Sequence, residues 1–204
     1  MKNMKRIIFV LGSQRSGTNV LRQSLSADPK TTGFNESSND ELFDNWFLRP
    51  ESEIREFIQK QQGTVLIKPI KSVLLTSVKS FLREFSNYDI GVSWIYRDPV
   101  NVFYSRRKRW SYLKDVGKFT NEWSRINQSA LDANDDRINF VGYENLAERK
   151  AVFEKLCKSL GINGKHLFKK GHNDGYANLE KETISRITRE TRSVHEALQS
   201  QSIR

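Results

Sequence analysis

A glycine-bounded turn directly after an apolar run constrains this chain more than any other feature. The apolar run extends from Ile7 to Leu11, the turn lies between Gly12 and Gly17, and helical spacing of apolar residues resumes at Val20. A strand, a tight loop and a helix in this order direct backbone N–H groups and the positive end of the helix dipole at one spot. The segment therefore predicts an anion-binding turn early in an α/β fold.

The rest of the chain alternates short β-rich runs with segments of helical spacing. Such alternation indicates a parallel sheet covered on both faces, so we expect a three-layer α/β fold. At 204 residues, one domain over 1–204 is expected rather than two. The predicted strands are Arg6 to Leu11, Thr64 to Lys68, Ile90 to Tyr96 and Ile138 to Tyr143, and the later predicted helices are Val73 to Phe85, Val116 to Asn134, Ala151 to Leu160 and Leu179 to Gln199.

The cysteine count and the lengths of the apolar and polar segments indicate the compartment of the protein and the place of a long loop. Cys157 is the single cysteine, so no internal disulfide can form, which favours a reducing compartment and the cytoplasm. It lies in an apolar helical stripe and is predicted to be a buried core residue. No apolar stretch approaches the ~20 residues of a membrane span. The polar segment Thr31 to Pro50 is interpreted as an ordered loop or a substrate lid.

The net charge of +10, from 34 Lys and Arg against 24 Asp and Glu, predicts an anionic partner or simply high solubility. Nucleic acid, a phosphorylated cofactor and an acidic membrane would each fit. Because the basic residues are dispersed, charge alone is weak evidence for nucleic acid.

The glycine turn differs from the loop of nucleotide triphosphatases. That signature, G-x-x-x-x-G-K-[ST], places a lysine after the second glycine and a magnesium-binding hydroxyl next. Here Gly12 and Gly17 have the required separation, but Thr18 and Asn19 follow, and the cation is Arg15, two residues before the second glycine. The turn can meet a phosphate while it lacks the usual magnesium arrangement.

The segment QRSGTN (14–19) resembles the 5′-phosphosulfate loop of sulfotransferases, in which Lys or Arg precedes Ser-Gly-Thr. The resemblance implies a P-loop-type fold and a sulfuryl donor, 3′-phosphoadenosine 5′-phosphosulfate (PAPS), with no metal required. It also implies that the loop binds the 5′-phosphate and that its guanidinium stabilises the leaving oxygen. The residues concerned are Arg15, Ser16, Gly17, Thr18 and Asn19.

Two further segments match the same family in the expected order. In WIYRDPVNVFYSRRKRW (94–110) a strand ends at Arg97, and Ser105 follows eight residues later, which implies a site for the 3′-phosphate. A guanidinium suits that role because its donors form a fork and it keeps its charge. Tyr143, in a Tyr-Glu-Asn-Leu segment, would lie near the adenine. Lys169, Lys170 and Gly171 resemble a stretch that closes over the 3′-phosphate.

The catalytic groups are the least determined part of the resemblance. Lys68 corresponds to a second cation near the sulfuryl group, but Ile70 replaces the histidine base of cytosolic members. Glu36 takes the position of the base in several bacterial members, and a carboxylate in a partly dry pocket can act in this way. The alternatives for the base are Asp40, Glu41 and His172.

The acceptor is expected to be a hydroxyl or amine of a small molecule or carbohydrate. The basic run from Arg106 to Arg109 is either a solvated helix face or a guide for an anionic acceptor. Two other functions stay open: a P-loop kinase or nucleotide triphosphatase, and a basic nucleic-acid-binding module that uses interleaved aromatics, most of which we expect in the core. Aromatic candidates for an acceptor pocket, each equally open to a packing role, are Trp46, Phe47, Tyr88 and Trp110.

Overall fold

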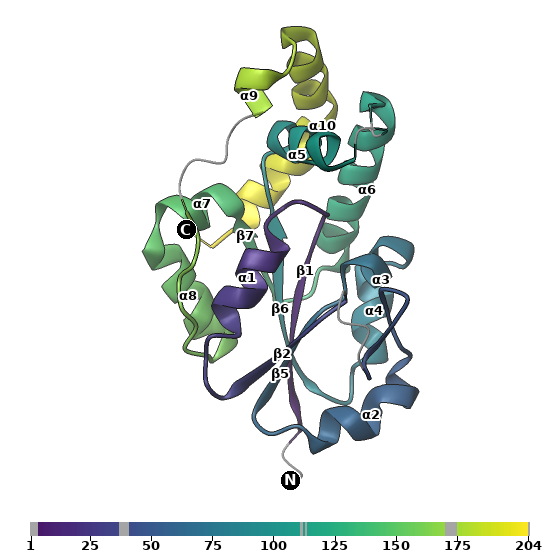
Figure 1. The fold of residues 1–204 in the computed structure, drawn as a ribbon, viewed down its shortest axis with the longest axis vertical. Coiled ribbons are helices and arrows are strands. Elements are labelled where there is room, and N and C mark those ends of the chain that lie inside the picture. Colours follow the sequence, from purple (N-terminus) through teal and green to yellow (C-terminus); the bar gives the residue numbers. More distant parts are fainter. Residues whose placement is uncertain (1–3, 37–40, 111, 113, 170–174, 204) are drawn as a thin grey trace.

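The computed structural model describes residues 4–36, 41–110, 112, 114–169 and 175–203 (Figure 1). A five-stranded parallel sheet forms its centre, with strand order β2-β5-β1-β6-β7. The predicted three-layer α/β fold is confirmed, and all four predicted strands are present. The strands are β1 (Arg6–Gly12), β2 (Thr31–Asn35), β5 (Thr64–Lys68), β6 (Asp89–Tyr96) and β7 (Ile138–Gly142).

The segment Thr31 to Pro50 contains structure that its sequence pattern did not indicate. Its first five residues form the edge strand β2, and a short antiparallel hairpin follows, made of β3 (Phe43–Asp44) and β4 (Phe47–Leu48). The β2 sequence Thr-Thr-Gly-Phe-Asn lacks an apolar run because an edge strand pairs on one side only and is partly exposed. The interpretation as a loop is therefore wrong for these residues.

The predicted helix Val73 to Phe85 is two helices, α3 (Ile70–Leu75) and α4 (Val78–Glu84). Thr76 has an extended backbone, and the Ser77 side chain accepts a hydrogen bond from the Ser80 N–H, which starts a new helix. The other predicted helices are confirmed within a few residues. The remaining helices are α1 (Thr18–Leu25), α2 (Glu51–Lys60), α5 (Pro99–Arg109), α6 (Val116–Ala133), α7 (Tyr143–Glu148), α8 (Lys150–Leu160), α9 (Gly175–Asn178) and α10 (Lys181–Gln201).

Alternation along the central strand builds a core on each face of the sheet. Ile8 and Val10 pack with α1, α7 and α8, whereas Phe9 and Leu11 pack with α4, α6 and α10. In Figure 1, α1, α7 and α8 lie on one side of the sheet, and α4 and α6 lie on the other. Cys157 is buried in the first layer, which confirms its packing role. No helix among the described residues is long and apolar enough to cross a membrane.

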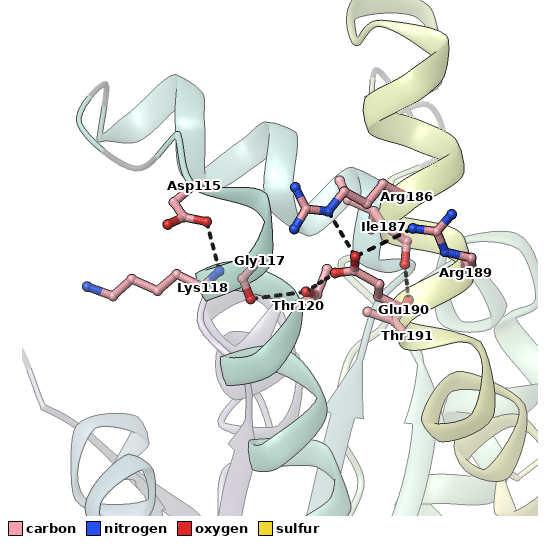
Figure 2. A network of polar contacts seen from close by, with 9 residues as sticks. All are labelled: Asp115, Gly117, Lys118, Thr120, Arg186, Ile187, Arg189, Glu190 and Thr191. Atoms are coloured by element: carbon pink, nitrogen blue, oxygen red, sulfur yellow. Dashed lines mark hydrogen bonds and ion pairs between the residues drawn. The ribbon is translucent and has the colours of Figure 1, made fainter.

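The long C-terminal helix α10 is held against α6 by a polar network (Figure 2). The buried Thr120 hydroxyl of α6 donates to Glu190 of α10 over 2.7 Å and lies 3.1 Å from the Gly117 carbonyl. Glu190 also accepts from Arg186 over 2.8 Å. Ile187 and other apolar residues of α10 are buried, so the helix forms part of the second layer.

Candidate active site

The turn after β1 has a backbone that only particular residues can adopt. Gly12 and Gly17 have φ values of 147° and 98°. A Cβ on Gly12 would lie 2.1 Å from the Ile95 carbonyl oxygen, and one on Gly17 would lie 2.5 Å from the Tyr143 ring. Both glycines are therefore required for β1, β6 and α7 to approach one another closely. The turn ends where α1 begins at Thr18.

Arg15, inside this turn, contacts the distant helix α5. Its backbone has a positive φ of 71°, and its Nε donates to the Ser105 hydroxyl over 3.0 Å. Burial lowers the pKa of Arg15, and the neighbouring guanidinium groups of Arg109 and Arg97 lower it further. Three positive charges thus gather at the turn, which favours an anion there.

The end of β6 supplies the opposite side of the site. Arg97 is 8% exposed, and its guanidinium carbon lies 4.7 Å from the centroid of the Tyr143 ring. Asp98 then caps α5 by accepting from the Asn101 N–H over 3.1 Å. Burial raises the pKa of the nearby Glu144, whose carboxylate accepts from the Asp98 N–H over 3.2 Å. These contacts fix Arg97 between β6 and α7.

A cavity of about 590 Å³ joins these two sides. Its lining brings together seven of the predicted binding residues, which come from the turn, α1, β6, α5 and α7. Six further residues also line it, and of these the sequence had linked only Lys169 to the 3′-phosphate and Lys108, within the basic run, to an anionic acceptor. The predicted residues are Arg15, Gly17, Thr18, Asn19, Arg97, Ser105 and Tyr143, and the further ones are Val20, Asn101, Tyr104, Lys108, Leu167 and Lys169.

A sequence signal could have found three of these additional residues. Asn101, Tyr104 and Lys108 share one face of α5 with Ser105, at the three- and four-residue spacing of a helix. The Asn101 side chain also accepts from the Gly175 N–H over 3.0 Å, and thereby ties α9 to the cavity wall. No comparable pattern marks Leu167.

Some predicted residues lie elsewhere. The Ser16 side chain is buried inside the turn, 2.6 Å from the Ser13 hydroxyl, and is not among the described residues that line the cavity. Lys170 and Gly171 lie outside the described residues, as do two alternatives for the base, Asp40 and His172.

Glu36 and Lys68 form a separate, almost buried pair at the ends of β2 and β5. The Lys68 ammonium lies 2.8 Å from one carboxylate oxygen of Glu36, and the Lys71 N–H donates to the other over 2.9 Å. Neither Glu36 nor Lys68 is among the described residues that line the cavity. Because parallel strands end at one edge of the sheet, the pair lies at the same edge as the turn after β1.

A family model described as "Sulfotransferase domain" matches residues 5–192. The chain belongs to the sulfotransferase family. Solved structures agree on the P-loop-type fold. A sulfotransferase from Alicyclobacillus acidocaldarius superimposes with a TM-score of 0.64 at 15% identity, covering 96% of this chain and 95% of the other. The sulfotransferase domain of the olefin synthase from Synechococcus PCC 7002 gives 0.60 at 19% identity, covering 98% and 96%. No curated protein matches the sequence.

The remaining candidate groups of this sulfotransferase have packing roles or are exposed. Tyr88 is buried and donates to Glu51 over 2.7 Å, so it belongs to the core. Of the interleaved aromatics, Trp94, Tyr96 and Phe103 are buried in the core, whereas Tyr104 and Trp110 are partly buried and Tyr112 is exposed. Glu41 is exposed. Among the described residues, no group of three or more His, Cys, Asp and Glu side chains could hold a metal ion.

Proposed function

We propose that this sulfotransferase takes its sulfuryl group from PAPS and transfers it to a hydroxyl or amine of a small-molecule or carbohydrate acceptor. The supporting observation is that Arg15 and Arg97, far apart in the sequence, line one cavity together with the aromatic ring of Tyr143. A doubly phosphorylated adenosine needs two anion sites, one for each phosphate, and a ring surface for its adenine. The cavity has these features, and Lys108 and Lys169 add positive charge to it.

The residues present fit this donor by chemistry. In the proposal, Arg15, Gly17, Thr18 and Asn19 hold the 5′-phosphosulfate, since the turn brings a guanidinium and the start of α1 together. Arg97 and Ser105 hold the 3′-phosphate, and Tyr143 lies along the adenine. Ser16 contributes its backbone, because its side chain is buried in the turn. Lys170 and Gly171 keep their predicted place over the 3′-phosphate as part of the proposal.

Glu36 is the proposed general base, and Lys68 is its partner. When bound, PAPS supplies a sulfuryl group whose bond to the 5′-phosphate oxygen is broken in the reaction. Glu36 takes the proton from the acceptor as the acceptor oxygen or nitrogen bonds to sulfur, and Arg15 stabilises the negative charge on the leaving oxygen. The contact between Lys68 and Glu36 implies that the lysine positions the carboxylate as well as contributing charge.

The proposal also covers the location of the protein and its need for a metal. The cytoplasm is the proposed location, because a single buried cysteine suits a reducing compartment. Transfer is proposed to need no metal, since cationic side chains supply the neutralising charge.

Thermal unfolding in the presence of nucleotides tests the donor. A ligand that binds the folded state alone raises the melting temperature, and the rise grows with the logarithm of the ligand concentration relative to its Kd. We expect 3′-phosphoadenosine 5′-phosphate (PAP) to raise it by several degrees and ATP with Mg²⁺ to leave it nearly unchanged. A shift with ATP and Mg²⁺ but none with PAP would instead support a P-loop kinase or triphosphatase.

A further inference from the structure

The hairpin β3–β4 ends in an unusual turn. Its two connecting residues, Asn45 and Trp46, have φ values of 48° and 74°. Two positive φ values in a two-residue connection are the pattern of a type I′ turn, which strongly favours Asn-Gly. Asn45 suits its position, but a tryptophan at positive φ is strained, because its Cβ crowds the backbone. Glycine would adopt the conformation of Trp46 at a lower cost.

Burial of the indole does not offset this strain. Trp46 is 54% exposed, whereas Trp94 and Trp123 are each 0% exposed in the core. The next residue of the hairpin, Phe47, contacts α3, because the Lys71 ammonium lies 4.0 Å from the centroid of its ring. Strained residues cluster at binding and active sites, where a side chain must be presented in a fixed direction. The exposed indole of Trp46 has the properties of such a residue.

The turn is held beside the proposed base. Lys71 donates through its side chain to the Asn45 carbonyl over 3.1 Å and through its backbone N–H to Glu36 over 2.9 Å. A second contact, from the Leu48 N–H to the Ser72 hydroxyl over 2.8 Å, fixes the hairpin to α3. Lys71 therefore holds both the turn and the carboxylate of Glu36. Trp46 is not among the described residues that line the cavity assigned to PAPS.

We infer that Trp46 is a stacking platform for the acceptor, and that the acceptor is a ring-bearing alcohol. This inference rests on the proposed function, because it assumes that Glu36 receives the acceptor proton. A ring with a flat apolar face, whether a phenol or a pyranose, gains affinity by stacking on an indole held in place. A linear alcohol offers no such face.

The substitution Trp46→Gly separates a binding role from a structural one. It removes the indole and creates the Asn-Gly turn that the backbone favours, so the variant is expected to unfold in urea at the same or a higher concentration. PAP affinity, measured by calorimetry, should not change. With PAPS as donor, the KM for 4-nitrophenol, methyl β-D-glucopyranoside or both should rise about tenfold, while activity toward 1-hexanol should be low and unaltered. Trp46→Phe should restore part of the lost affinity.

Each outcome has one meaning. If the wild-type protein binds PAP but the KM values for both ring acceptors are unchanged by Trp46→Gly, or if it uses neither ring acceptor, the inference fails while the donor assignment stands. An equal loss with 1-hexanol, or a lower urea midpoint, would show that Trp46 supports the hairpin instead. Absence of PAP binding by the wild-type protein would overturn the proposed function itself. The ring acceptor that responds identifies whether the platform serves an aromatic or a sugar ring.

Discussion

The carboxylate of Glu36 accepts hydrogen bonds from Lys68 and from the backbone of Lys71, so its position is fixed by two donors. We expect Glu36→Gln to lower kcat by on the order of 10²- to 10⁴-fold, because the amide keeps the size of the side chain but cannot take a proton. PAP affinity should remain near that of the wild-type protein. Steady-state kinetics and calorimetry provide the two measurements.

Glu41→Gln is the matched control, since Glu41 lies in the same segment and is exposed. It should leave both kcat and PAP affinity unchanged. Full activity of Glu36→Gln would remove Glu36 from the mechanism, and a large loss in Glu41→Gln would transfer the role of base to that residue.

For single residues, the sequence predicted which charged side chains follow the strands better than it predicted contacts between side chains. Arg15 and Arg97 were predicted because both match sulfotransferase motifs in which an arginine follows a strand. The Lys68–Glu36 pair could not, since it depends on the edge strand β2 lying beside β5, and β2 carries no apolar run. The buried side chain of Ser16 was missed because backbone geometry sets its direction.

Among the elements, α10 carries a histidine whose environment makes stability depend on pH. His195 packs edge-on against the rings of Tyr96 and Trp123, and burial lowers its pKa although Asp98 and Glu196 act in the opposite direction. The unfolded chain therefore takes up a proton near pH 6.5 before the folded protein does. The free energy of unfolding should fall as the pH drops below about 6.5.

The variant His195→Phe tests this origin of the acid sensitivity. It keeps an aromatic ring between Tyr96 and Trp123 but cannot titrate. Urea titrations at several values from pH 7 to pH 5 should give a shallower decline for the variant than for the wild-type protein. The raised pKa of Glu144 acts with the opposite sign, but it is common to both proteins and cancels in the comparison. Equal declines would show that His195 does not cause the effect.

The hydrogen bonds between α6 and α10 are expected to contribute to the stability of the folded protein. Thr120→Val removes the hydroxyl that contacts Glu190 and Gly117 and keeps the shape of the side chain (Figure 2). We expect the free energy of unfolding to decrease by about 1 kcal/mol, as measured in urea. Ser185→Ala, an exposed change on α10, should have no effect. Equal stabilities of Thr120→Val and the wild-type protein would mean that apolar packing alone holds α10.

Helices with a clear apolar face were predicted close to their observed bounds, as α6, α8 and α10 illustrate. The division into α3 and α4 was not, because a continuous apolar pattern passes through the break at Thr76 and Ser77. The pattern reports which residues face the core, and a local side-chain cap decides where a helix starts.

For the whole molecule, the two apolar cores share one sheet, so we predict a single cooperative unit over 1–204. Far-ultraviolet circular dichroism and tryptophan fluorescence should give the same urea midpoint. Fluorescence is informative because Trp94 and Trp123 are both fully buried. Two separate transitions would contradict the prediction of one domain.

The central claim is that Arg15 and Arg97 bind two ends of one doubly phosphorylated adenosine, and calorimetric titration with PAP tests it most directly. The account predicts one PAP per chain, an affinity about 10- to 100-fold weaker in Arg15→Met and in Arg97→Met, and no change in Arg107→Met, which removes an exposed charge of α5. A folded wild-type protein that takes up no PAP, or unchanged affinity in both cavity variants, would contradict it.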